Sequence, residues 1–100
     1  MVAANHKMNF GTVEAEYDRR VDVLSVRLGG FVDYEGDGLP GGIELDFALG
    51  DGAPCGLKVI GFQRNGWIGK IDELKDVASR HLALDPFIIG KSIDLAISSS

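Results

Sequence analysis

Acidic side chains are concentrated in one stretch of this chain, between residues 31 and 54. The stretch holds no lysine or arginine, and its carboxylates are Asp33, Glu35, Asp37, Glu44, Asp46 and Asp51. Carboxylates can bind a cation, divide acid and base roles in catalysis, or attract a basic protein. The simpler alternative is that these are solvated charges on loops and strand faces, because acidic side chains are seldom buried.

The run from Asp33 to Gly38 places acids at alternate positions, as a calcium loop does, and Glu44 is the twelfth residue counted from Asp33. However, Pro40 and Gly41 occupy two of the later loop positions, and the flanking segments have strand patterns instead of helical ones. The pattern therefore favours a turn with solvated acids, and we expect no metal site.

The other reactive residues lack the neighbours that catalysis or metal binding needs. His6 and His81 have no His or Cys at ligand spacing. Cys55 has no histidine near it in the sequence, so we interpret it as a small apolar residue and not as a nucleophile. We therefore expect no catalytic residue and no cofactor. One alternative stays open, namely a ligand binder or enzyme that uses two of the carboxylates of Asp18, Asp22, Glu44 and Asp46.

Trp67 is the only tryptophan of the chain. Tryptophan is enriched at the centres of protein interfaces, so Trp67, with Phe62 and Ile68 nearby, can anchor a partner or a second subunit. The alternative is that its ring packs a helix onto a sheet.

Four segments have the alternating pattern of half-buried strands. They are Thr12–Tyr17, Val21–Leu28, Ile43–Phe47 and Cys55–Phe62. The first two are joined by a turn at Asp18–Arg20, whose Asp side chain can bind backbone N–H groups. Residues 33–42 are predicted to form a loop. In the fourth segment apolar residues occupy both faces, which predicts that both faces of that strand are covered.

A helix is predicted after these strands, because Ile71, Leu74, Ala78 and Leu82 fall at helical spacing. The dipeptide Asp85-Pro86 is predicted to end it. Residues Ser92–Ile97 alternate again and are predicted to form a fifth strand. The sequence thus indicates an α+β fold, an antiparallel β-meander of four to five strands with one helix packed on one face. Residues 1–10 are predicted to be a flexible tail, and residues 11–100 a single domain.

Composition sets further bounds. The net charge of −5 disfavours direct binding to nucleic acid. The single cysteine excludes an internal disulfide, and we find neither a signal peptide nor a membrane-spanning apolar run. We therefore expect a cytoplasmic protein that does not act at a membrane. Because a chain of 100 residues buries a modest core, a second subunit in a homodimer would add useful buried area.

The residues of the first hairpin resemble a known family. Tyr17-Asp18, then Asp22, then the alternating Leu24, Val26 and Leu28 resemble the YuzE-like family of small bacterial proteins of unknown function. The likeness continues through Glu35, the Ile43–Asp46 strand, and the glycine turn before residues 56–60, so it covers about residues 14–62. It implies a small antiparallel sheet with no established activity, and some family members look like the antitoxin half of two-gene toxin modules.

Three hypotheses follow for function. We favour a non-enzymatic protein-binding module that resembles an antitoxin. It would bind a basic protein partner through its acidic side chains and through an edge of its sheet. The expected contacts are Asp33, Glu35, Asp37, Glu44, Asp46 and Trp67. The alternatives are the carboxylate-based enzyme or ligand binder, and a homo-oligomeric structural subunit in which Ser92–Ile97 extends or exchanges between protomers.

Overall fold

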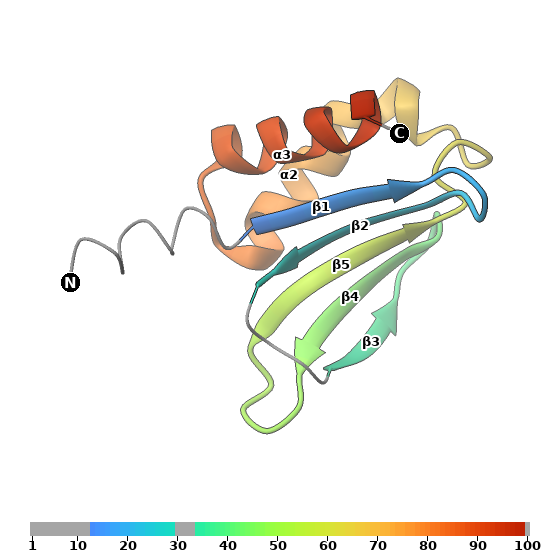
Figure 1. Cartoon of the computed structure of the whole chain (residues 1–100). Helices are drawn as coiled ribbons and strands as arrows, with labels where there is room; N and C mark the ends of the chain where they lie inside the picture. The colour runs from blue at the N-terminus through green and yellow to red at the C-terminus, as the bar shows by residue number, and fades with distance from the viewer. Residues whose placement is uncertain (1–12, 30–33, 100) are drawn as a thin grey trace.

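The computed structural model describes residues 13–29 and 34–99 and has an α+β fold with a five-stranded antiparallel sheet (Figure 1). The strands are β1 (Val13–Asp18), β2 (Val23–Leu28), β3 (Tyr34–Gly38), β4 (Ile43–Ala48) and β5 (Pro54–Ile60). The helical segments are a short 3-10 helix, η1 (Trp67–Lys70), followed by α2 (Ile71–Leu82) and α3 (Pro86–Ser99). The predicted fold class and antiparallel sheet are confirmed, whereas the single helix is wrong because there are two α-helices.

The sheet is not a simple meander, since its strand order is β1-β2-β5-β4-β3. After β2 the chain passes to the far edge of the sheet, forms β3 there, and returns through β4 to β5, which pairs with β2. The outer strands are therefore β1 and β3, and β5 lies at the centre of the sheet.

The prediction of a loop over residues 33–42 is wrong for residues 34–38, which form β3. Each residue of β3 pairs with one of β4, from Tyr34 opposite Ala48 to Gly38 opposite Glu44. Glycines and acids have low strand propensity, so pairing with β4, and not local preference, makes this segment a strand. Asp33 lies outside the described residues.

The core lies between the sheet and the helices. Cross-strand neighbours on the helix side, such as Leu24, Val59 and Ile43, are 5% exposed or less. The expectation that β5 is covered on both faces is wrong. Ile60 is 45% exposed, and Phe62, which is fully buried, belongs to the turn after the strand.

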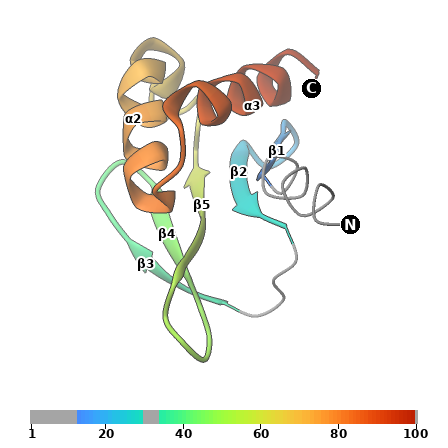
Figure 2. The same ribbon diagram turned by 90° about the vertical axis from the view of Figure 1, so that its left-hand side faces the viewer.

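Both helices cover the same face of the sheet (Figure 2). The core stripe of α2 is as predicted, with Leu74, Ala78 and Leu82 buried. The helix ends at Ala83, whose φ is +54°, and the N–H of Leu84 donates to the carbonyl of Ser79 at 3.1 Å. This left-handed turn closes the helix before the dipeptide at 85–86 is reached.

The prediction that Asp85-Pro86 ends the helix is wrong, because α2 has already ended at Leu82 and these two residues begin α3. Asp85 Oδ1 accepts a hydrogen bond from the N–H of Phe87 at 2.8 Å, and Pro86 occupies the first helical position. Aspartate at the cap and proline after it are a common helix start.

The prediction of a strand at Ser92–Ile97 is wrong, because these residues lie within α3. Ile89 and Ile93 are fully buried, which is the helical spacing, whereas Leu95 is 58% exposed. A strand formed or exchanged by this segment therefore has no support in this structure. The predicted tail, residues 1–10, lies outside the described residues. In the part of the chain that is described, neither helix is long and apolar enough to cross a bilayer.

Candidate functional site

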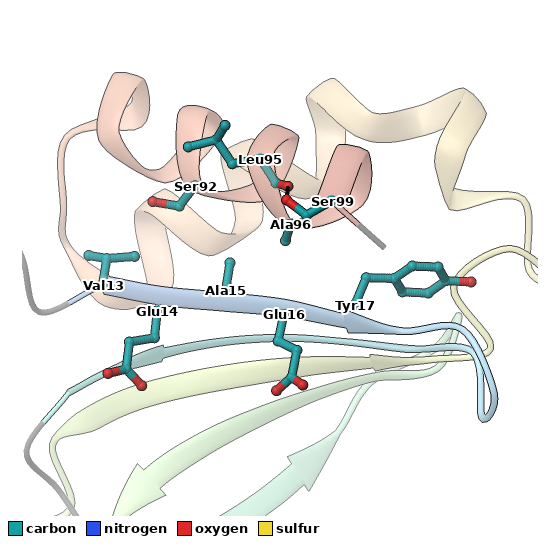
Figure 3. A pocket seen from close by; sticks show the side chains of 9 residues that line it. All are labelled: Val13, Glu14, Ala15, Glu16, Tyr17, Ser92, Leu95, Ala96 and Ser99. Atoms are coloured by element: carbon teal, nitrogen blue, oxygen red, sulfur yellow. Dashed lines mark hydrogen bonds between the residues drawn. The ribbon is translucent and has the colours of Figure 1, made fainter.

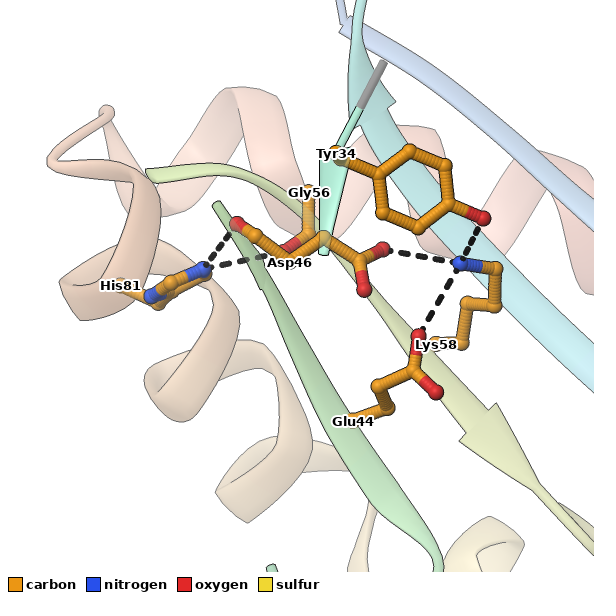
Figure 4. A network of polar contacts seen from close by, with 6 residues as sticks. All are labelled: Tyr34, Glu44, Asp46, Gly56, Lys58 and His81. Atoms are coloured by element: carbon orange, nitrogen blue, oxygen red, sulfur yellow. Dashed lines mark hydrogen bonds and ion pairs between the residues drawn. The ribbon is translucent and has the colours of Figure 1, made fainter. Parts of the chain in front are cut away.

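A cluster of polar side chains lies on the sheet face that the helices leave open (Figure 4). Its centre is Lys58 of β5, whose Nζ donates to Glu44 Oε2 at 3.2 Å, to Asp46 Oδ2 at 3.0 Å and to Tyr34 Oη at 2.6 Å. Glu44 is directly opposite Lys58 in the β4–β5 pair, and Tyr34 comes from the edge strand β3. The cluster therefore ties three adjacent strands together.

Asp46 is the buried member, with an exposed fraction of 3%. Burial, together with the neighbouring carboxyl of Glu44, raises the pKa of Asp46 to about 6. The neighbouring Asp46 carboxyl, and then Lys58, lower the pKa of Glu44. Burial by itself would lower the pKa of Lys58, but its hydrogen bonds to Tyr34 and the two carboxylates raise it overall.

Two small features let this cluster form. Gly36 of β3 has no side chain where the carboxylate of Glu44 lies, and a Cβ at that position would overlap it. The ring of Tyr34 lies 4.0 Å from Lys58 Nζ, so the ammonium also gains a cation–π contact. These contacts bind the glycine-containing strand β3 to the rest of the sheet.

His81 of α2 supports the cluster from the opposite side. Its Nε2 lies 3.2 Å from the carbonyl oxygen of Asp46 and 2.9 Å from that of Gly56. Both partners are acceptors, so Nε2 carries the proton. The β4–β5 register shifts between Asp46 and Phe47, and His81 satisfies carbonyls at this irregularity. His81 is thus a structural hydrogen-bond donor.

This geometry does not favour acid–base catalysis by the predicted carboxylate pair. Glu44 and Asp46 do lie together, as that hypothesis required, but both face the ammonium of Lys58. Neither residue lines the groove along β1 that is described below. Within residues 13–29 and 34–99, no group of three or more His, Cys, Asp or Glu side chains is arranged to hold a metal ion.

Two further acids of the predicted set, Glu35 and Asp37, are separated from this pair. Register places Gly36 and Gly38 on the face of Asp46 and Glu44, so Glu35 and Asp37 lie on the opposite face of β3. There they are exposed and border a shallow hollow beside Phe47. The acids therefore do not converge as a calcium loop requires.

The other two predicted carboxylates, Asp18 and Asp22, shape the turn between β1 and β2. Asp18 accepts the N–H of Arg20 at 3.0 Å, as predicted for a turn-forming aspartate. Asp22 has φ of +59° and accepts the hydroxyl of Tyr17 and the N–H groups of Gln63 and Arg64, all within 3.0 Å. These hydrogen bonds lower its pKa. Asp22 thus clamps the loop after β5 to the first hairpin, a role that only its distant partners reveal.

Trp67 is buried, in keeping with the second of its two predicted roles. It is 6% exposed, and its Nε1 donates to the carbonyl of Gly41 at 2.7 Å. The ring joins the turn before β4 to the start of the helical segment. Cys55 is 4% exposed and burial raises the pKa of its thiol, which fits the predicted apolar role.

A groove runs along the outer edge of β1, below α3 (Figure 3). Its volume is about 570 Å³, and it is lined by Val13, Glu14, Ala15, Glu16, Tyr17, Ser92, Leu95, Ala96 and Ser99. Side chains of both strand faces contribute, so the groove follows the strand edge itself. Sequence reasoning missed it, because three of its nine lining residues, Ser92, Leu95 and Ala96, belong to a segment that was predicted to be a strand.

No family model, curated protein or solved structure matches this chain.

Proposed function

We propose that this chain is a non-enzymatic module that binds a basic protein partner. The observation that carries the proposal is the acidic and uncovered side of the sheet. Glu14, Glu16 and Asp18 follow one another on the open face of β1, at a free edge of the sheet. Such a row of carboxylates attracts a cationic surface and steers its approach.

The distribution of ion pairs supports this role. Glu14 approaches Arg27 only at 3.7 Å, with both side chains substantially exposed, and Glu16 has no ion-pair partner within the described residues. Exposed pairs of this kind are weak, so these carboxylates remain available to a partner. In contrast, Glu44 and Asp46 are engaged by Lys58. Of the predicted contact acids, Glu35 and Asp37 of β3 are exposed, but they lie at the opposite edge of the sheet and on its other face, apart from the row on β1.

Affinity capture tests the proposal. The full chain, tagged, is used as bait in extracts of the cells that make it, beside an unrelated protein of similar net charge. We expect a basic protein to be captured by this chain alone and to be released as salt rises, since salt screens charge pairs. Capture of the same proteins by both baits, or of no basic protein, would refute the proposal.

The antitoxin-like role implied by the YuzE-like resemblance is one form of this function. It predicts that the captured partner is a small basic protein whose own activity falls when this chain binds. Homodimer formation also remains a prediction, and light scattering of the purified chain measures it directly.

A further inference from the structure

We propose that the groove between β1 and α3 binds an extended segment of the partner by strand addition, and that basic and small apolar residues alternate in that segment. This rests on the proposed function and assigns it a site. The supporting observations are the free strand edge, the groove beside it and the two kinds of side chain along it.

The edge of β1 supplies the main-chain contacts. All six residues of β1 pair with β2 on one side, and no described strand lies on the other side. In an antiparallel pair, alternate residues direct their N–H and C=O groups away from the partner. Half of the β1 residues therefore present both groups to the groove, along a strand about 20 Å long. An added strand would satisfy them, as in other complexes formed by β-augmentation.

The two sides of β1 determine the side chains of the added strand. Toward α3 lie Val13, Ala15 and Ala96, which form a small apolar wall. Toward the open face lie Glu14 and Glu16, both exposed. Because side chains of a strand alternate between faces, a fitting segment places small apolar residues under α3 and basic residues beside the two glutamates.

Charge excludes a second copy of this chain as the preferred occupant. Antiparallel pairing of two β1 strands across a two-fold axis would bring Glu14, Glu16 and Asp18 of both copies onto one face of a continuous sheet. Like charges at directly opposite strand positions are destabilising. If the added segment carries basic residues at these positions, each repulsion with Glu14, Glu16 and Asp18 becomes an attraction.

Titration with synthetic peptides tests the site on the full chain. One peptide of about eight residues alternates lysine and valine, and a second has the same composition with all lysines before all valines. Both peptides carry the same charge, but only the alternating one can present lysines on one face of an extended strand and valines on the other. We expect the alternating peptide to bind at least about tenfold more tightly, with amide shift changes concentrated in residues 13–18 and 92–99.

Two variants separate charge from shape. Glu14→Gln with Glu16→Gln should weaken the alternating peptide by about 3- to 10-fold, the range for exposed ion pairs. The matched control, Glu35→Gln with Asp37→Asn on the other edge strand, changes net charge equally, from −5 to −3, and should bind like the wild type. Ser92→Trp, placed in the groove wall, should block binding, and a dispersed amide spectrum would show that this variant is folded.

Several outcomes would overturn the site. They are equal binding of the two peptides, equal weakening by both charge variants, amide shifts outside β1 and α3, or contacts between residues 1–12 and α3 that fill the groove in the free chain. A concentration-dependent dimer joined at β1 would also overturn it. If a basic protein is captured but its cross-links map to another surface, the proposed function stands and this site falls. If no basic protein is captured while the alternating peptide binds as described, the peptide site stands and the proposed function falls.

Discussion

Replacing Asp46 by asparagine should make the protein more stable at neutral pH, and the gain should disappear in acid. In the folded chain Asp46 is 3% exposed, and its Oδ1 has no hydrogen-bond partner among the described residues. Its ionised form is therefore disfavoured despite the ion pair with Lys58. Asparagine has nearly the same shape, carries no charge, and has an NH2 group that can donate a hydrogen bond, as a protonated carboxyl can.

The size of the effect follows from the pKa of Asp46. That pKa rises from 3.8 to about 6 on folding, and each pKa unit corresponds to ~1.4 kcal/mol. The folded chain binds this proton more tightly than the unfolded chain does, so ionisation costs stability as pH rises from about 4 to about 6. Above that window the cost is complete, about 3 kcal/mol. Below it the carboxyl is protonated in both states, and no cost remains.

Denaturant unfolding measures the difference directly, since the buried Trp67 is the only tryptophan and its fluorescence reports unfolding. The free energy of unfolding of Asp46→Asn minus that of the wild type should rise by about 3 kcal/mol between pH ~3 and pH ~7. Taking the difference between the two proteins largely cancels the other titrating groups, such as Asp22. Asp37→Asn, which removes an exposed carboxylate, is the control and should give the same small difference at both pH values. Parallel pH profiles of Asp46→Asn and the wild type would refute this account of the cluster.

Three further predictions concern other parts of the molecule. Asp22→Ala should lower the melting temperature more than Asp18→Ala, because Asp22 holds a distant loop whereas Asp18 bonds within its own turn; equal shifts would contradict this. His81→Ala should cost about 1–3 kcal/mol in denaturant unfolding by leaving two carbonyls without their donor, and His81→Gln should recover part of it; no loss would show that the carbonyls are solvated. Phe87 of α3 is 72% exposed, so Phe87→Lys should unfold at the same denaturant concentration as the wild type. If the wild type is a dimer through this face, light scattering of Phe87→Lys should show a monomer.

The parts of the fold that the sequence predicted are those whose side chains alternate between core and solvent. In β2, Leu24 and Val26 are buried as expected, and the helical stripe of Leu74, Ala78 and Leu82 is as well. In these segments the burial of each residue depends on which face it occupies, and periodicity reports that face.

The errors arise where pairing or context outweighs the pattern. The β3 segment contains Gly36 and Gly38, so nothing local favours a strand, and its pairing with β4 is a tertiary effect. In α3, Ile93, Leu95 and Ile97 alternate, which suggested a strand. The Asp85-Pro86 start and the four-residue spacing from Ile89 to Ile93 were the helical signals.

The candidate sites were predictable only in part for the same reason. That acids would gather on a sheet followed from composition, but the union of Glu44 and Asp46 around Lys58 needed the register of β4 and β5. The groove needed both the strand order, which leaves β1 at an edge, and the helical form of α3.

The two edges of the sheet differ in a way that bears on function. The edge strand β3 is short, contains two glycines and carries the exposed acids Glu35 and Asp37. It is bound to its neighbours by the contact between Tyr34 and Lys58. Short, charged edges resist the addition of another strand. At β1, the strand has small apolar residues on one side, carboxylates on the other, and a groove along its free edge. In the complex that we propose, these acids deter pairing with a second copy of the same chain and attract a basic strand, so the charge that protects this edge would also select its partner.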